Sequence, residues 1–433
     1  MSAVRVPLLP MMRFFADPVK RLFELSKRGD VVPIARGAVF AAFGADHNRT
    51  VLADATRFHN FAEAPMKLGA DTAAARLGAH NLTNLNGERH RSRRRLAMPA
   101  FDRAAIAGYK DAIADEIDRR LPRFAPGKTC DLAAEMTELS CTIAMRCLFG
   151  LDGFDPGSVG RLCVDYLACL VDPRAMMFPF DLPGTPYRRL LRTGETIERR
   201  MSELIAARRE RPGDDVLSRL IVAHDDDGST FSDAELIAQA WMFFVAGFET
   251  TANTLTWTLF LLAQHADVDL GDAAALDRVI SESMRLLPAT PCLFLRRVAQ
   301  PVELGGERLA EGAIVIVSPL ITHRDPKLYP EPARFVPDRW HELAPGPYDY
   351  MPFGAGPRRC AGAGFAGQTI QLALSALLAR ARPALDPGTR VSRRVRGIVL
   401  GPKYGMPMRF VAPGDRVTRA PLRGDIDELV DFS

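Results

Sequence analysis

The chain has 433 residues, 47% hydrophobic and 25% charged, so it can bury a large core as one large domain or two. Its formal net charge of +4 does not by itself indicate nucleic-acid or membrane binding, so any charged partner must be argued from a local patch. The seven cysteines include no CxxC pair and mostly fall in apolar stretches, which indicates buried thiols in a reducing compartment rather than disulfides or an iron–sulfur site.

The N-terminal stretch MSAVRVPLLPMMRFFADP contains no apolar run adequate for a signal peptide or membrane anchor, because prolines and arginines interrupt it. We therefore expect a cytoplasmic protein without a membrane anchor. The most apolar segment, residues 240–263, has the length of a membrane span. Polar side chains at its middle, among them Glu249 and Asn253, favour a buried helix instead.

The first sixty residues predict a short helix, two strands and a second helix. The first helix covers Pro18 to Lys27, and VVPIARGAVFAAFG predicts two strands that turn at Arg36-Gly37. The second helix is expected to end near Phe58. The Gly/Ala/Asn-rich stretch at residues 61–86 predicts a loop with a weak helix.

An arginine-rich segment, GERHRSRRRLAMPAF, covers residues 87–101. Three interpretations compete for it: a nucleic-acid patch, a solvated charged face, or a helix that binds the acid groups of a cofactor and an acidic partner. His90 and Arg94 are four residues apart, so they lie on one face of a helix. This pattern alone is weak, and a solvated face is the default interpretation.

Residues 102–224 are predicted to be mainly helical, with breaks at segments rich in proline and glycine. The break at residues 171–187 combines four prolines with apolar bulk, so it could form a mobile lid over an apolar pocket or a packed loop. The acidic turn at residues 225–228 lacks the spaced ligands of a calcium loop, so no calcium site is expected.

A long helix is predicted to begin after Ser232 with Glu235 as its capping partner, and to continue to about Ala266. The 33 residues from Ala234 would span about 50 Å. At its centre lies AGFETT, residues 246–251, where Gly247 leaves room for a ligand. The Thr250 hydroxyl can bond back to the carbonyl four residues earlier, and an unpaired acid at 249 would be costly in an apolar helix. The structural alternative is a polar bridge between helices.

The next helix carries Glu282 and Arg285, which form an i,i+3 pair 78 residues before Cys360, with Arg339 following in FVPDRW. VELGGERLAEGAIVIVSP predicts strands with a Gly-Gly hairpin turn, and GIVLGPKYGMPMRF predicts a final hairpin. The charged tail after Pro413 is expected to be mobile.

The most informative stretch is FGAGPRRCAG, residues 353–362, which leads directly into an apolar helical pattern. Cys360 would lie at a helix N-terminus, where free N–H groups and the helix dipole stabilise a thiolate. The glycines let backbone pass close to a flat cofactor, and Arg358 could meet anionic groups on its rim. One thiolate without a neighbouring second ligand suits an axial ligand of heme iron. The structural alternative is a Gly-rich turn with a buried cysteine.

The pattern FxxGxRxCxG resembles the heme-binding loop of the cytochrome P450 family. The resemblance covers residues 18–411, and the motifs occur in the family's order. It implies one mainly α-helical domain over residues 1–433 with a smaller β-rich part, in which residues 18–411 form the core and residues 412–433 the charged tail. It also implies a heme-thiolate monooxygenase with heme b (iron protoporphyrin IX) between the long central helix and the cysteine loop.

The resemblance implies a role for each matching residue. Cys360 would bind the iron, and Glu249 and Thr250 would relay protons to bound O2. The expected cofactor contacts are His90, Arg94, Arg297 (with Arg296 as a possible substitute), Arg358, Phe353, Gly354, Ala246 and Gly247. The expected structural network that holds the cysteine loop is Glu282, Arg285 and Arg339. The expected substrate pocket, besides Ala246 and Gly247, is Phe243, Phe244, Leu293, Phe294, Leu295 and Ile398.

The apolar pocket predicts a lipophilic substrate such as a terpenoid, steroid, polyketide or fatty acid. Because no fused redox module fits in the chain, electrons are expected from a ferredoxin and its NAD(P)H-dependent reductase, docked on an outward face carrying Arg91, Arg93 and Arg95. A peroxide-driven peroxygenase, a non-catalytic heme sensor and a DNA-binding protein are the alternatives. Thr250 and Glu282 are only 32 residues apart, so the family's intervening helix is expected to be shortened.

Overall fold

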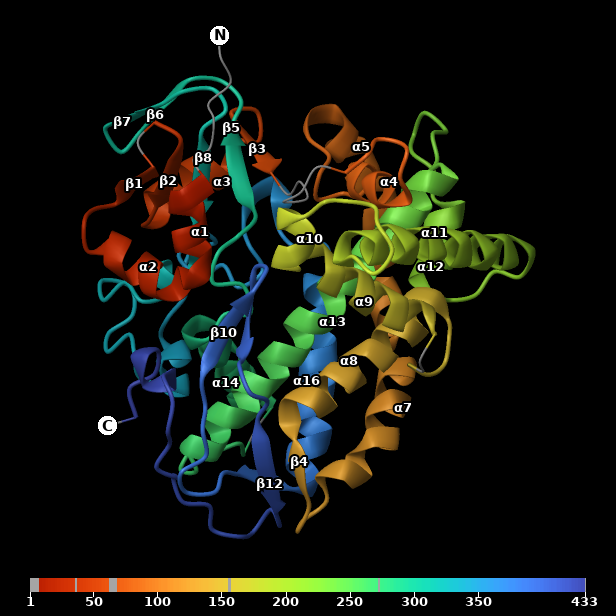
Figure 1. Ribbon diagram of the computed structural model, residues 1–433. Helices are drawn as coiled ribbons and strands as arrows, with labels where there is room; N and C mark the ends of the chain where they lie inside the picture. The colour runs from red at the N-terminus through yellow and green to blue at the C-terminus, as the bar shows by residue number, and fades with distance from the viewer. Residues whose placement is uncertain (1–7, 36, 62–67, 155–156, 272, 433) are drawn as a thin grey trace.

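The computed structural model describes residues 8–35, 37–61, 68–154, 157–271 and 273–432. Helices form most of it and small sheets flank them, which confirms the expected fold class (Figure 1). The α-helices are α1 Leu8–Ala16, α2 Pro18–Ser26, α3 Ala45–Ala53, α4 Ala73–Ala79, α5 Gly87–Ala97, α6 Arg103–Gly108, α7 Lys110–Arg120, α8 Leu132–Phe149, α9 Val159–Leu170, α10 Pro173–Met177, α11 Pro186–Glu210, α12 Val216–Val222, α13 Asp233–Gln264, α14 Ala273–Leu286, α15 Pro319–Thr322 and α16 Ala363–Arg380.

The strands belong to four small sheets. They are β1 Val31–Ala35, β2 Val39–Ala42, β3 Phe58–Phe61, β4 Thr129–Asp131, β5 Leu295–Val298, β6 Val302–Leu304, β7 Glu307–Leu309, β8 Ile314–Val317, β9 Arg382–Ala384, β10 Arg393–Arg396, β11 Val399–Pro402 and β12 Pro407–Val411. The 3-10 helices are η1 Met98–Phe101, η2 Leu121–Phe124, η3 Pro337–His341, η4 Gly356–Arg358 and η5 Ile426–Glu428.

Helix α13 crosses the centre of the helical part (Figure 1). It begins as predicted with a capping box, in which the Ser232 hydroxyl accepts from the Glu235 N–H and the Glu235 carboxylate accepts from the Ser232 N–H. Most of its side chains are buried, because α8 and α16 pack along it and cover it on several sides. None of the helices in the described part of the chain combines the length and the apolar character that a membrane crossing needs.

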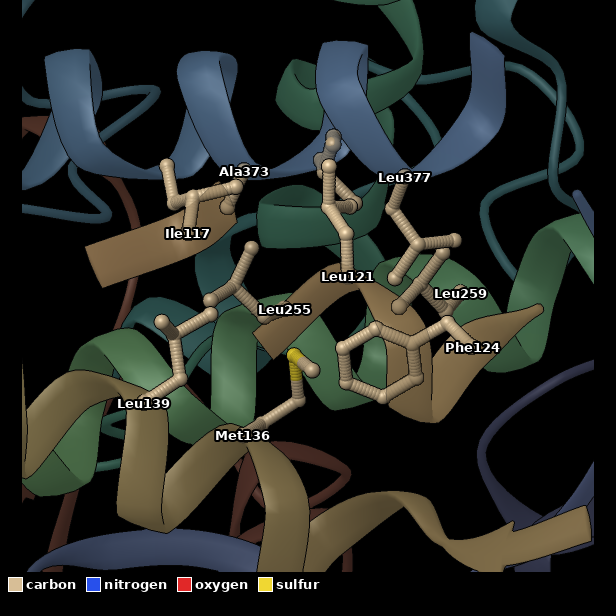
Figure 2. A pocket seen from close by; sticks show the side chains of 10 residues that line it. Ile117, Leu121, Phe124, Met136, Leu139, Leu255, Leu259, Ala373 and Leu377 are labelled. Carbon is tan, nitrogen blue, oxygen red and sulfur yellow. The ribbon is translucent and has the colours of Figure 1, made fainter. Parts of the chain in front are cut away.

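The contact between α7, α8, α13 and α16 is tightly packed, as Figure 2 shows. Only a void of about 10 Å³ remains there, roughly the space of one water molecule. Its lining is apolar: Ile117, Leu121, Phe124, Met136, Leu139, Leu255, Leu259, Ala373, Leu374 and Leu377. This void belongs to the core and offers no ligand site, but its tight packing fixes α13 relative to α16, the helix that follows the cysteine loop.

The largest sheet has the strand order β1-β2-β8-β5-β3. Strands β1 and β2 pair antiparallel as predicted, with Gly37 at a φ of 72° in the connection, whereas Arg36 lies outside the described residues. The helix expected to end near Phe58 is wrong, since α3 ends at Ala53 and Phe58–Phe61 is strand β3. The Asp54 carboxylate accepts from two following N–H groups, and such a turn ends a helix.

Two expectations near the C-terminus are also wrong. The Gly305-Gly306 hairpin of β6 and β7 is confirmed, but the predicted final hairpin is not present. Strand β11 pairs with β10, while β12 pairs with β4 and β9. The tail expected to be mobile packs against the helical body through Ile426, Leu429 and Val430, which are buried.

The connection between α13 and α14 is short, as expected. Residues 265–271 contain no helix, so the segment that the family resemblance placed there is reduced to turns. The tail packs at this position: the Phe432 ring lies 6.0 Å from the rings of Phe260 and His265, measured between centroids. The Asp431 N–H donates to the Ala333 carbonyl at 2.8 Å.

Candidate functional site: the cysteine loop and the central helix

The cysteine loop is held in shape by its own backbone and by α3. The Cys360 N–H donates to the Phe353 carbonyl at 2.9 Å, which closes the loop. Gly354 and Gly356 have φ values of 67° and 69°, a region that other residues rarely adopt. A Cβ atom on Gly356 would lie 2.3 Å from the Leu52 carbonyl oxygen, so glycine is needed for this close approach.

Cys360 differs from the other cysteines of the chain. It has an exposed side chain, whereas Cys130 is half-buried and the remaining five are buried. The surrounding protein nevertheless raises the pKa of the Cys360 thiol through burial, against the opposing effects of the Gly362 N–H and of Arg94 and Arg359. The sulfur therefore borders an accessible space that lies deep in the protein. Among the described residues, no cluster of three or more histidine, cysteine or acidic side chains could hold a metal ion.

Four basic side chains converge near the loop. Burial lowers the pKa of Arg296 to about 10. Burial and the charges of Arg296 and Arg94 lower the pKa of Arg358 to about 10. Burial, followed by the charges of Arg358 and Arg94, lowers the pKa of His90 to about 3, so this ring is neutral. Within the described residues no carboxylate forms an ion pair with Arg94, Arg296 or Arg358, so the cluster can accept an anionic group.

Backbone carbonyls fix the arginines of this cluster. Arg358 donates to the carbonyls of Leu82 and Leu85 at 3.2 and 2.5 Å. Arg94 in α5 donates to the Arg359 carbonyl at 2.7 Å, which ties α5 to the cysteine loop.

Strand β5 directs its two arginines differently, because neighbouring side chains in a strand point to opposite faces. Arg296 is buried, donates to the Phe294 carbonyl at 2.7 Å and also bonds the Asn60 side chain. The Arg297 guanidinium lies 4.0 Å from the centre of the Phe61 ring. Arg296, ranked below Arg297 from the sequence, is thus the arginine whose charge acts on His90 and Arg358. The signal in the sequence that could have indicated Arg296 is the pair of adjacent arginines at 296 and 297.

The middle of α13 presents one accessible face. Ala246 is exposed although it lies mid-helix, and Gly247 is half-buried. The Thr250 hydroxyl donates to the Ala246 carbonyl at 2.8 Å, as the sequence predicted. Residues four apart share a helix face, so Ala246 and Thr250 border the same space.

Phe243 and Phe244, expected in the substrate pocket, fill the core instead. Phe244 is fully buried, and its ring stacks on Phe149 at 5.8 Å between centroids. The Phe243 ring meets Phe101 edge-on at 4.9 Å. Phe244 lies on the opposite side of α13 from Ala246, whereas Phe243 shares the face of Ala246 but is buried by its contact with Phe101.

Glu249 is half-buried next to this face. Burial raises the pKa of its carboxyl group, and the charges of Arg396 and Arg394 in β10 oppose the shift. A carboxyl group with a raised pKa keeps its proton to higher pH, which suits a proton donor.

Of the remaining expected pocket residues, Leu293 lies beside the cysteine loop and Ile398 lies at a hairpin tip. A Cβ atom on Gly354 would lie 3.9 Å from the Leu293 side chain. Phe294 is 38% exposed, Leu295 is half-buried, and half-buried Ile398 lies in the turn between β10 and β11.

The structure brings together Glu282, Arg285 and Arg339 as expected. The Glu282 carboxylate lies 2.9 Å from Arg285 and 3.0 Å from Arg339, and it also accepts from the Trp340 indole at 2.9 Å. The side chains of Glu282 and Arg285 are fully buried. A buried pair of this kind is costly to break, because removing one partner leaves the other charge uncompensated.

This network connects to the start of the cysteine loop through His323. Arg285 donates to the His323 carbonyl at 2.8 Å, and the His323 Nε2 accepts from the Met351 N–H at 2.9 Å. Burial lowers the pKa of His323 to about 3, so the ring is neutral and Nε2 can accept. Met351 lies two residues before Phe353, so the hydrogen bond from Met351 to His323 ties the network to the backbone where the cysteine loop begins.

The family model described as Cytochrome P450 matches residues 18–270 and 269–407. The chain belongs to the cytochrome P450 family. It is 35% identical over 356 residues to "Cyclooctatin synthase" of Streptomyces melanosporofaciens, which covers 73% of this chain and 76% of that protein. It is 31% identical to "Cyclooctat-9-en-7-ol 5-monooxygenase" of the same organism, over 89% of each. It is 30% identical to "Pentalenene oxygenase" of Streptomyces avermitilis, over 70% of this chain and 73% of that protein.

A solved structure, "Retinoic acid bound cyanobacterial CYP120A1", matches with a TM-score of 0.81 at 23% identity, over 95% of this chain and 98% of that one. This likeness shows that the fold is that of a P450. Membership in the family makes the chain a P450 monooxygenase with a heme-thiolate cofactor, a small-molecule substrate and redox partners. An accessible thiol on a glycine-rich loop fits a heme with its two acidic side chains, and so do buried Arg296 and half-buried Arg94 and Arg358, which pair with no carboxylate of the described residues.

The arginines expected to form the partner surface of this P450 are engaged within the chain. Arg91 pairs with Glu88 at 2.6 Å, and Arg95 pairs with Asp225 at 2.8 Å. Arg93 is largely covered and pairs at 2.6 Å with the buried carboxylate of α13's capping box. The expectation that all three face outward is therefore wrong for Arg93, and the other two are partly neutralised.

Proposed function

We propose that this P450 hydroxylates or otherwise oxidises a lipophilic terpenoid-like molecule, as a single-domain protein over residues 1–433. The observation that carries the proposal is the accessible Cys360 thiol beside a cluster of uncompensated arginines, in a chain that shares at least 30% identity with relatives named for cyclooctatin, cyclooctat-9-en-7-ol and pentalenene. The half-buried apolar side chains of Leu293, Leu295 and Ile398, with the exposed Phe294, would supply a lipophilic surface for such a substrate.

The Cys360 sulfur would bind the iron, and the basic cluster would hold the propionates. Bound heme supplies oxygen activation, and a thiolate ligand favours O–O cleavage. In this proposal Arg94, Arg296 and Arg358 donate to the propionate oxygens, and neutral His90 donates one ring N–H. Arg297 stays a predicted contact, while Phe353, Gly354, Ala246 and Gly247 would adjoin the flat faces of the cofactor without steric bulk.

Proton delivery would use Glu249 and Thr250. Burial raises the pKa of the Glu249 carboxyl group, so this group keeps its proton to higher pH than an exposed glutamate does. The Thr250 hydroxyl borders the accessible face and could pass a proton toward the reacting oxygen when its bond to the Ala246 carbonyl exchanges. The presence of this pair favours O2 over peroxide as the oxidant.

Electrons would come from a ferredoxin and its NAD(P)H-dependent reductase. Because Arg91, Arg93 and Arg95 are engaged, we place the docking surface on exposed cations beside the cysteine loop, namely Arg89, Arg103 and Lys110. Helix α6, which begins at Arg103, lies against α16, since the Gln368 amide donates to the Ile106 carbonyl at 2.9 Å. Complementary charge would guide an acidic partner to this surface.

The test combines a spectrum with product analysis. Reduced protein exposed to carbon monoxide should give the red-shifted Soret band of a thiolate-ligated heme, and the Cys360→Ser variant should lose that band. Wild-type protein reconstituted with a ferredoxin and its reductase is then given cyclic terpene hydrocarbons and alcohols, and products are identified by mass spectrometry. A normal heme spectrum with no oxidised terpenoid would reject the substrate class, and absence of the thiolate band would reject the site.

A further inference from the structure

A second cavity lies at the far end of α13, beside the C-terminal tail and the short connection to α14. Its volume is about 610 Å³, within the range of small-molecule sites. We call it the tail groove, and its lining is Gln264, His265, Ala266, Asp267, Arg334, Phe335, Arg382, Arg416, Val417, Thr418, Arg419, Asp431 and Phe432. Gln264 follows Thr250 by fourteen residues, a helical distance of roughly 21 Å, so the groove is separate from the catalytic face.

Positive charge exceeds negative charge in the tail groove, which is lined by four arginines and two aspartates. Arg416 is exposed and has no hydrogen-bond or ion-pair partner in the described part of the chain. The Arg419 guanidinium lies 5.7 Å from the centre of the Phe432 ring. These two tail side chains can therefore turn toward an anion without breaking an ion pair.

Gln264 supplies a second, independent observation. Its side chain is only 3% exposed, and neither its amide nitrogen nor its amide oxygen has a partner among the described residues. A buried amide that neither donates nor accepts costs free energy, so this side chain calls for a partner in the groove. Because both amide atoms are unsatisfied, the matching ligand carries an acceptor oxygen and a hydroxyl donor together.

The negative end of the α13 dipole would oppose an anion at this place. Two interactions reduce that opposition. The Ala266 carbonyl accepts from Arg382 at 2.7 Å, and the Leu261 carbonyl accepts from the His265 N–H at 3.0 Å. Of these two carbonyls only that of Leu261 belongs to α13, which ends at Gln264, and the groove's four arginines outnumber its two aspartates.

We propose that the tail groove binds a small hydroxylated oxyanion, either a phosphate group or a hydroxycarboxylate, between Gln264 and the tail arginines. The Gln264 amide would donate to an anion oxygen and accept from its hydroxyl group. Arg416 and Arg419 would close over the anion from the tail. The ligand would thereby fasten residues 416–432 to the end of the helix that carries the proton relay.

The test is calorimetric titration of the heme-loaded enzyme with inorganic phosphate and, separately, with citrate, at matched ionic strength. We expect saturable binding of at least one of these probes. In the Arg416→Glu and Gln264→Leu variants, the loss of one charge-assisted hydrogen bond should weaken probe binding about tenfold or more. The control is Arg199→Glu, which makes the same charge change at an exposed position of α11 and should leave binding unchanged.

Each outcome decides the matter. Binding of citrate alone identifies a hydroxycarboxylate as the ligand class, and binding of phosphate alone identifies a phosphate group. No saturable heat from either probe, or equal weakening in all three variants, would overturn the proposal. If Gln264→Leu fails to fold, the exposed Arg416→Glu variant decides. Hydrogen exchange gives a second readout, because bound ligand should slow exchange at residues 416–432.

Discussion

Removal of the Glu282 carboxylate should destabilise the protein far more than removal of an ordinary ion pair. Its oxygens accept from the side chains of Arg285, Arg339 and Trp340, and also from the Val336 N–H at 3.0 Å. In Glu282→Ala the fully buried Arg285 would keep its charge with no counter-charge. Breaking a buried pair in this way costs about 3–5 kcal/mol. Because Arg285 also supports the His323 carbonyl, the loss should reach the cysteine loop and reduce heme retention.

The assay is urea unfolding of the heme-free protein, followed by the ratio of heme to protein after purification. Glu331→Ala is the matched control, because Glu331 and Arg334 form an i,i+3 pair at 2.5 Å with exposed side chains. Surface pairs of this kind contribute about 0–1 kcal/mol. If Glu282→Ala and Glu331→Ala lose similar stability, or if heme retention is unchanged in Glu282→Ala, our account of the network is refuted.

Three further predictions concern turnover. Thr250→Ala should lower the product formed per NAD(P)H consumed by about a hundredfold, the usual contribution of a positioned proton donor, with release of peroxide measured as the balance. Turnover should fall as pH rises through the raised pKa of Glu249, because only the protonated carboxyl donates, and Glu249→Gln should abolish this pH dependence; an unchanged profile would exclude Glu249 as donor. Arg89→Glu with Arg103→Glu should raise the KM for ferredoxin and flatten its salt dependence without changing the heme spectrum, whereas Arg199→Glu should do neither.

The sequence was sufficient for features that depend on local order along the chain. The capping box at Ser232, the Thr250 bond to its own helix and the pairing of Glu282 with Arg285 are contacts within a single helix, and spacing alone specifies them. The cysteine loop is local as well, since glycines at positive φ and one closing hydrogen bond shape it. Such features need no knowledge of how distant segments meet.

The sequence was insufficient where the rotation or partner of an element decides the result. Phe243 and Ala246 share a face of α13, and only the tertiary packing around that helix buries Phe243 while it leaves Ala246 exposed. Arg296 and Arg297 are equally cationic, and only the pairing of β5 with β3 and β8 separates their surroundings. Strand β12 pairs with β9 and β4 and not with β11, the strand before it in the sequence. No local sequence pattern predicts this pairing.

The segment at residues 332–334 is held by hydrogen bonds from two parts of the chain that are synthesised at different times. Arg285 donates to the carbonyls of Pro332 and Arg334 at 2.7 and 3.0 Å, while the Asp431 N–H donates to Ala333. Because synthesis runs from the N-terminus, α14 leaves the ribosome well before residue 431 is made. The scaffold behind the cysteine loop is therefore complete only after residue 431 has been made and has packed, so stable cofactor uptake should follow that step.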